Sequence, residues 1–150
     1  TTEGGLDARA NLSLVRAAVH RLREAEVISS LFIDPDPHQI EAAHEVGAQQ
    51  VELCTSEYSD ATLGGRAAHT EHAARAAHEL KRLREAAALA AQYGLRVAAG
   101  HGLTYRNVGA VAAIHEITEF NIGHNIVSRA IFVGLESAVR EMREAIRSKQ

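Results

Sequence analysis

The sequence contains a single cysteine, Cys54, among its 150 residues. One thiol cannot form a disulfide within the chain, and this fits the reducing cytoplasm, which is the location we expect. No apolar run approaches the roughly 20 residues that span a bilayer, so no membrane contact is expected. The net charge is −3 with histidine neutral, so no broad basic face for nucleic acid is expected either. What remains is ordinary for a globular domain, with 46% hydrophobic and 23% charged residues.

Low-complexity linkers are also missing, so residues 1–150 are expected to belong to one domain. The expected strands are residues 27–33, 50–54, 95–100 and 119–123. The expected helices are residues 12–22, 37–46, 66–93, 105–114 and 125–148. The last of them is expected to break near Gly134. A polar connection is expected over residues 55–65. Asp7 and Asp36 are expected helix caps, and Gly47 and Gly94 are expected helix stops.

Strands that alternate with helices, and that are continuously apolar, indicate an α/β fold with a parallel sheet. Four such βα units fit a doubly wound sheet, or half of an eight-stranded barrel of about 250 residues. The pattern alone does not decide between them. The barrel is favoured because barrels often bind phosphate on the loops after their last two strands, and the last two strands here end in glycine and histidine.

Those two strand ends are the strongest functional signal. The first carries Gly100-His101-Gly102 and the second carries Gly123-His124. Glycine lets backbone N–H groups at a helix start approach an anion, so Gly102, Gly123 and His124 are predicted to cradle a phosphate. His101 could exchange a proton with the same ligand. The alternative is that the glycines serve tight turns and the histidines are solvated, but two matched junctions favour function.

Glu52 is the next candidate, because it interrupts the apolar strand 50–54. A buried carboxylate is costly unless it is paired or points into a polar cavity. It could therefore act in a barrel mouth as an acid, a base or a stabiliser of positive charge. An edge strand with Glu52 facing water is an equally good interpretation of the residues alone.

Other chemistry-bearing residues give weaker signals. The amino-terminal stretch Thr1–Gly5 has the composition of a substrate loop, but also that of a frayed end. His69, Glu71 and His72 lack a third ligand at a recognisable spacing, so we predict no metal site and a solvated helix face. Cys54 has no evident base and is expected to be a small buried apolar residue.

At these residues the sequence resembles a known family. The stretches that carry the resemblance are TTEGGLD, SLFIDPDPHQIEAAHEVGAQQVEL, GLRVAAGHGLTYRNV and EFNIGHNIVSRAIFVGL. In order along nearly the whole chain, they are similar to the bacterial pyridoxine 5′-phosphate synthases of the deoxyxylulose-dependent vitamin B6 pathway. The similarity is weakest over residues 55–76.

The resemblance implies a (β/α)8 barrel that forms homo-oligomers and needs no metal or organic cofactor. Its reaction would condense 1-deoxy-D-xylulose 5-phosphate with 3-amino-2-oxopropyl phosphate to pyridoxine 5′-phosphate, phosphate and water. By matching motifs, His101 would be a proton donor and Glu52 would stabilise the transition state. The aminoketone phosphate would be held by Gly102, Gly123 and His124. Thr2 would contact the deoxyxylulose phosphate.

Two departures accompany the resemblance. Cys54-Thr55-Ser56 stands where the family usually has His-Thr-Gly, which puts the local loop geometry in doubt. The family's amino-terminal half is also absent, with its further bases and arginines, so the chain is expected to be the carboxyl-terminal part of such an enzyme.

Because of that absence, the 150-residue chain alone is expected to be inactive. It is also expected to self-associate through open sheet edges and uncovered interior side chains such as Phe32, Val51 and Val97. Two rival interpretations remain: a half-barrel that binds phosphate without catalysis, and a self-associating structural α/β domain.

Overall fold

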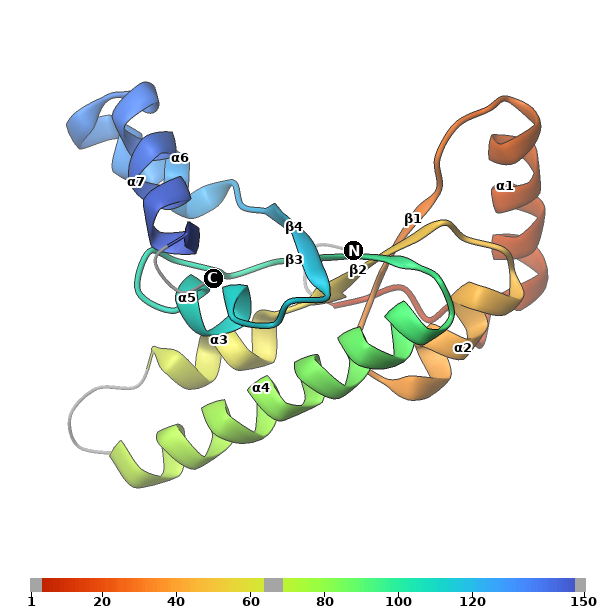
Figure 1. The fold of residues 1–150 in the computed structure, drawn as a ribbon, viewed down its shortest axis with the longest axis horizontal. Helices are drawn as coiled ribbons and strands as arrows, with labels where there is room; N and C mark the ends of the chain where they lie inside the picture. Colours follow the sequence, from red (N-terminus) through yellow and green to blue (C-terminus); the bar gives the residue numbers. More distant parts are fainter. Residues whose placement is uncertain (1–3, 64–68, 148–150) are drawn as a thin grey trace.

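The computed structural model describes residues 4–63 and 69–147. Its centre is a four-stranded parallel sheet in the order β1-β2-β3-β4 (Figure 1). The strands are β1 (Ser30–Ile33), β2 (Gln50–Cys54), β3 (Arg96–Gly100) and β4 (Ile117–Asn121). A doubly wound sheet reverses its strand order partway across, whereas this order follows the sequence throughout. The described strands therefore show no reversal, and their order is compatible with half of a barrel.

Seven helices lie in the described ranges. They are α1 (Leu12–Glu24), α2 (Pro37–Glu45), α3 (Ser56–Thr62), α4 (His69–Gln92), α5 (Val108–Ala112), α6 (His124–Val133) and α7 (Leu135–Arg147). None of these described helices is long and apolar enough to cross a membrane.

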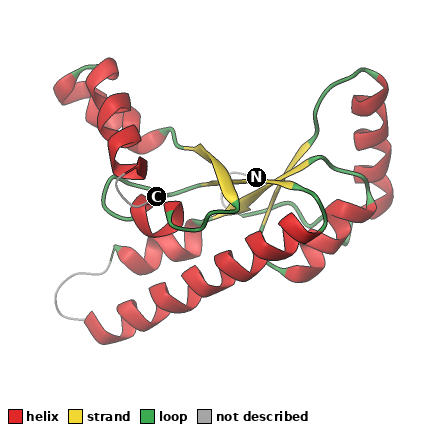
Figure 2. Ribbon diagram, in the orientation of Figure 1, coloured by secondary structure: helices red, strands yellow, loops and turns green. Residues whose placement is uncertain are grey.

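The core lies between the sheet and the helices α2 and α4, which run along one face of the sheet in Figure 2. Side chains alternate between the two faces of a strand. Val51 and Val97 are buried among the helix-facing residues, so the expectation that they line an uncovered barrel interior is wrong. Phe32 and Glu52 occupy the alternate positions and form one row across the opposite face with Ala98.

The ends of the helices follow from local chemistry. The Asp36 carboxylate accepts a hydrogen bond of 2.7 Å from the backbone N–H of His38, and Pro37 fills the first helical position. This confirms the predicted cap of α2. The Asp7 carboxylate accepts a hydrogen bond of 2.9 Å from the backbone N–H of Ala10, about one turn before α1 begins. The residue that directly precedes α1 is Asn11. The prediction that Asp7 caps that helix is therefore wrong by four residues.

Three of the expected strands have different bounds, although β3 differs by a single residue, because it begins at Arg96. Val27 and Ile28 are exposed and lie outside β1, and the N–H of Val27 donates to the carbonyl of Leu22 at the end of α1. Strand β4 begins at Ile117, which pairs with Val97, and ends before the turn into α6. At β1 and β4 the neighbouring elements, rather than the run of apolar residues, set the strand limits.

The polar connection expected over residues 55–65 contains helix α3. Tyr58, Ser59 and Ala61 are buried on it, and its position beside the loop after β3 is important for the site. The break predicted near Gly134 is confirmed, because this residue separates α6 from α7 with a φ of 80°.

Candidate functional site

A pocket of about 620 Å³ opens at the carboxyl ends of β2, β3 and β4. The predicted site residues Glu52, His101, Gly102, Gly123 and His124 all line it. They are up to 72 residues apart in sequence (124 − 52 = 72), and the parallel sheet brings them together because its strands all end at the same edge. The sixth predicted residue, Thr2, lies outside the described residues.

The carboxylate of Glu52 has a defined partner in this pocket. It accepts a hydrogen bond of 2.7 Å from the side-chain amide of Asn121 at the end of β4. Strand β2 is paired on both sides, so the interpretation of Glu52 as a residue of an edge strand is wrong. Sequence reasoning missed Asn121 as a site residue, since its only signal was a polar residue within the expected strand 119–123.

Gly100, which lies between these two residues, leaves room for them. A Cβ atom there would overlap a carboxylate oxygen of Glu52 and lie 2.8 Å from the backbone oxygen of Asn121. Both contacts are closer than real Cβ atoms show, so a side chain at Gly100 would displace the carboxylate or the strand. The last residue of β3 therefore helps to set the positions of Glu52 and Asn121, which line the pocket.

His101 follows directly after β3, as predicted, with a backbone φ of 84°. A non-glycine residue in this region costs about 1–3 kcal/mol and persists where its surroundings impose it. Its half-buried imidazole ring lies 5.9 Å from the ring of Phe32, between ring centroids, on the face of the sheet opposite the helices. The histidine thus points over the sheet into the pocket.

Gly102 also has a positive φ, of 81°, and packs against Ser59 of α3, where a Cβ would approach to 2.8 Å. Helix α5 begins only at Val108. The expectation that Gly102 presents its N–H at a helix start is therefore wrong, and its N–H belongs to the loop. The alternative interpretation, that the glycine serves a tight turn, is therefore correct for Gly102.

Gly123 and His124 are at a helix start. Gly123 precedes the first residue of α6, a helix of ten residues, and has no hydrogen bond from a capping side chain. The first N–H groups of a helix have no partner within it, and the helix dipole favours negative charge there. No atom lies within 4 Å of a Cβ built on Gly123, so the approach to these N–H groups is open.

Asn125 fixes this helix start relative to the loop after β3. Its side-chain oxygen accepts a hydrogen bond of 3.3 Å from the N–H of Tyr105, and the Tyr105 hydroxyl donates to the carbonyl of Ala138 in α7 at 2.9 Å. The loop after β3, the start of α6 and the middle of α7 are thereby held together on one side of the pocket.

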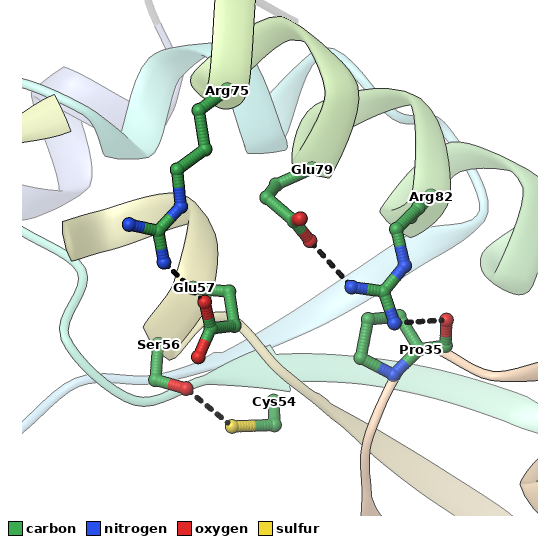
Figure 3. Close-up of polar contacts among 7 residues, drawn as sticks. All are labelled: Pro35, Cys54, Ser56, Glu57, Arg75, Glu79 and Arg82. Atoms are coloured by element: carbon green, nitrogen blue, oxygen red, sulfur yellow. Dashed lines mark hydrogen bonds and ion pairs between the residues drawn. The ribbon is translucent and has the colours of Figure 1, made fainter. Parts of the chain in front are cut away.

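The segment Cys54-Thr55-Ser56, where the resemblance put the loop geometry in doubt, has ordinary geometry here. Ser56 is the first residue of α3, so its backbone is helical and needs no glycine. Cys54 is buried, as predicted, and its sulfur lies 3.2 Å from the hydroxyl of Ser56 (Figure 3).

Charged side chains of α4 tie that helix to the elements beside this segment (Figure 3). Arg75 pairs with Glu57 of α3. Arg82 pairs with the buried Glu79 at 2.7 Å and extends to the carbonyl of Pro35, 3.5 Å away. These contacts lie outside the pocket and stabilise the elements that carry it.

Within residues 4–63 and 69–147, no group of three or more histidine, cysteine, aspartate or glutamate side chains is placed to hold a metal ion. The pocket offers instead a carboxylate, two imidazoles and open backbone N–H groups. These groups can bind a phosphate and exchange protons with a ligand that carries oxygen or nitrogen.

Comparison with known proteins gives a family match over almost the entire chain. The family described as "Pyridoxal phosphate biosynthesis protein PdxJ" matches residues 1–148.

Among curated relatives named pyridoxine 5′-phosphate synthase, the protein of a Synechococcus strain is 52% identical over 146 residues, 97% of this chain and 57% of its own length. That of Geotalea uraniireducens is 46% identical over 98% of this chain and 58% of its own length. That of Legionella pneumophila is 50% identical over 96% of this chain and 54% of its own length. The chain thus spans a little over half the length of these relatives.

A solved structure gives a more distant likeness. One chain in the crystal structure of the Amycolatopsis orientalis BexX/CysO complex superimposes with a TM-score of 0.56 at 15% identity. The match covers 94% of this chain and 52% of that one. At this identity the likeness concerns the fold alone.

Proposed function

Because this chain belongs to the pyridoxal phosphate biosynthesis PdxJ family, we propose that it provides part of the active site of a pyridoxine 5′-phosphate synthase. The reaction is the condensation of 1-deoxy-D-xylulose 5-phosphate with 3-amino-2-oxopropyl phosphate, which releases phosphate and water. The observation that carries the proposal is the convergence of Glu52, His101 and the start of α6 on one pocket. The chemistry of this reaction needs an anion site and a proton donor side by side, and these residues supply both.

The phosphate of the aminoketone is assigned to the start of α6. Gly123 and His124 offer backbone N–H groups there, and Gly102 faces the same pocket from the loop after β3. The open space at Gly123 supports this assignment, because a phosphate needs close approach to the backbone. Thr2 is proposed to contact the phosphate of the other substrate.

His101 is assigned as the proton donor and Glu52 as the stabiliser of positive charge. His101 stands at the rim of the pocket beside Phe32, where its imidazole can reach an oxygen that departs from the substrate. Glu52 lies one strand away, held by Asn121, with its charge directed to the same space. The carboxylate would favour a cationic intermediate formed from the amine.

The fold is proposed to be part of a single (β/α)8 barrel, with four of its βα units in residues 1–150. The sequential strand order, the parallel pairing and the helices on one face of the sheet support this assignment. In such a barrel the uncovered face with Phe32 and Glu52 would line the interior. Homo-oligomers are part of the same proposal.

A turnover assay tests the proposal. The protein in its natural length is incubated with both phosphorylated substrates, and pyridoxine 5′-phosphate and free phosphate are quantified, with each substrate omitted in turn. Formation of both products only with both substrates supports the synthase. Saturable phosphate binding without any product would instead support a binding domain, and the absence of both would support a structural role.

A further inference from the structure

We propose that Thr55 is a positioning residue that holds His101 in the orientation its proton transfer requires. The inference rests on the proposed function of the same pocket. Thr55 follows β2 directly, between the strand of Glu52 and helix α3, and only 1% of its surface is exposed. A buried hydroxyl must find hydrogen-bond partners, and those of Thr55 are in the loop that carries His101.

The threonine hydroxyl contacts two consecutive carbonyl groups across the sheet. Its oxygen lies 2.7 Å from the carbonyl oxygen of Gly100 and 2.6 Å from that of His101. The backbone N–H of Thr55 also donates to the carbonyl of Gly100 at 2.8 Å. The carbonyl of Gly100 therefore keeps a donor if the hydroxyl is removed, whereas that of His101 depends largely on the side chain.

The backbone of His101 needs such support. Its φ of 84° is unusual for a residue with a side chain, and conformations of this kind persist only where their surroundings impose them. The other contact to its carbonyl is the Ser59 hydroxyl, at the longer distance of 3.5 Å. Without the Thr55 hydroxyl, only this longer contact would hold the carbonyl of His101, and the strained φ could relax, which would turn the Cα–Cβ bond of His101. The imidazole would then leave its place beside Phe32.

Three variants in the protein of natural length test this role. Thr55→Val keeps the shape and removes the hydroxyl, whereas Thr55→Ser keeps the hydroxyl. Thr118→Val is the matched control, because the Thr118 hydroxyl lies 3.5 Å from the carbonyl of Val97, at the opposite end of β3 from His101. We expect Thr55→Val to lower kcat about 10- to 100-fold, since a small displacement of a reacting group has effects of this size. KM should stay within a few-fold, and Thr55→Ser and Thr118→Val should retain turnover close to that of the parent.

A second measurement does not depend on turnover. In the protein without substrate, the amide resonances of His101 and Gly102 should shift in Thr55→Val but remain in place in Thr55→Ser and in Thr118→Val. If the parent forms no product, the proposed function fails, and these resonances still decide the role of Thr55. Unmoved resonances, or a kcat of Thr55→Val equal to that of the parent, would overturn the inference. Should Thr55→Val not fold, Thr55→Ala, which also removes the hydroxyl, carries the same expectations.

Discussion

Gly100 lies beside the pocket and Gly123 lines it, and the two glycines leave room for different groups. Gly100 is required because the Glu52 carboxylate and the backbone of Asn121 occupy the space of a side chain. Gly123 has open space around it and an ordinary φ of −112°, so neither packing nor backbone strain demands glycine there. What a side chain at Gly123 would obstruct is the approach of a ligand to the first N–H groups of α6. This makes Gly123 the position where binding can be changed without changing the fold.

Gly123→Val should therefore weaken phosphate binding at least 10-fold, while the melting temperature stays close to that of the parent. Titration with inorganic phosphate by calorimetry or amide resonances measures the first quantity, and thermal denaturation measures the second. Ala91→Val is the control for added bulk, because Ala91 is exposed on α4 and is not among the residues that line the pocket. Unchanged phosphate affinity in the folded Gly123→Val variant would remove α6 from the binding site.

The sequence indicates some of these residues and conceals others. The histidines and glycines at two strand ends are visible because glycine next to histidine is an uncommon local pattern. Thr55 and Asn121 are not visible, since their partners are 45 or more residues away and only the pairing of β2, β3 and β4 brings them together. Local chemistry predicts the groups that face a ligand, and the register of the sheet determines the groups that hold them.

Among the secondary-structure elements, the short helix α3 contacts the loop that carries His101 at several points. Thr55 before it and Ser59 within it contact the carbonyl of His101. The Tyr58 hydroxyl donates to the carbonyl of Asn107 at 2.9 Å, and the Asn107 side chain donates to Thr62 at 2.9 Å. The helix thus fixes both ends of the loop between β3 and α5. Its seven residues are too few to show helical periodicity, so the sequence predicts only a polar connection there.

Tyr58→Phe should destabilise the protein at neutral pH by about 0.5–1.5 kcal/mol, because the Asn107 carbonyl loses its donor. Burial raises the pKa of Tyr58 above its ordinary value near 10. The unfolded chain therefore ionises first, and the contribution of this tyrosine is present below about pH 10 and is lost as the pH rises through the raised pKa. The difference in unfolding free energy between parent and variant should accordingly shrink above about pH 10.

Urea denaturation at several pH values measures this difference. Tyr93→Phe is the control, because Tyr93 lies at the surface and stacks on His44 with its ring, which the substitution retains. A Tyr58→Phe variant as stable as the parent at pH 7, or a difference independent of pH up to 11, would contradict the assigned hydrogen bond.

At the scale of the whole molecule, the described sheet has two outer edges and one face without helices against it. The edge on β1 is partly covered, because the N–H of Leu6 donates to the carbonyl of Phe32 at 2.7 Å, and the other edge is on β4. Unpaired strand edges favour association with another chain. Apolar side chains on α6 and α7 add to this tendency. Ile131 and Phe132 are 79% and 82% exposed, and Val127 and Leu135 are exposed beside them. The described residues therefore present a strand edge and a cluster of exposed apolar side chains, both of which favour association.

A polypeptide of residues 1–150 should accordingly sediment as an oligomer or aggregate rather than as a monomer of 16.2 kDa. Replacing Ile131 and Phe132 together by glutamate should reduce the association by adding charge to the exposed surface of α6. Gln92→Glu, at the exposed end of α4, serves as the control for added charge alone. A well-folded monomer at micromolar concentration would contradict this expectation.

The central claim is that the pocket at the strand ends performs chemistry in which His101 supplies a proton. The most direct test compares turnover of both substrates by the protein of natural length and by its His101→Asn variant, together with the affinity of each for phosphate. General acid catalysis typically contributes about 10²- to 10⁴-fold, so we predict a loss of kcat in that range with phosphate affinity nearly unchanged. Turnover by His101→Asn within a few-fold of the parent would show that His101 only binds or supports the loop, and would contradict the account.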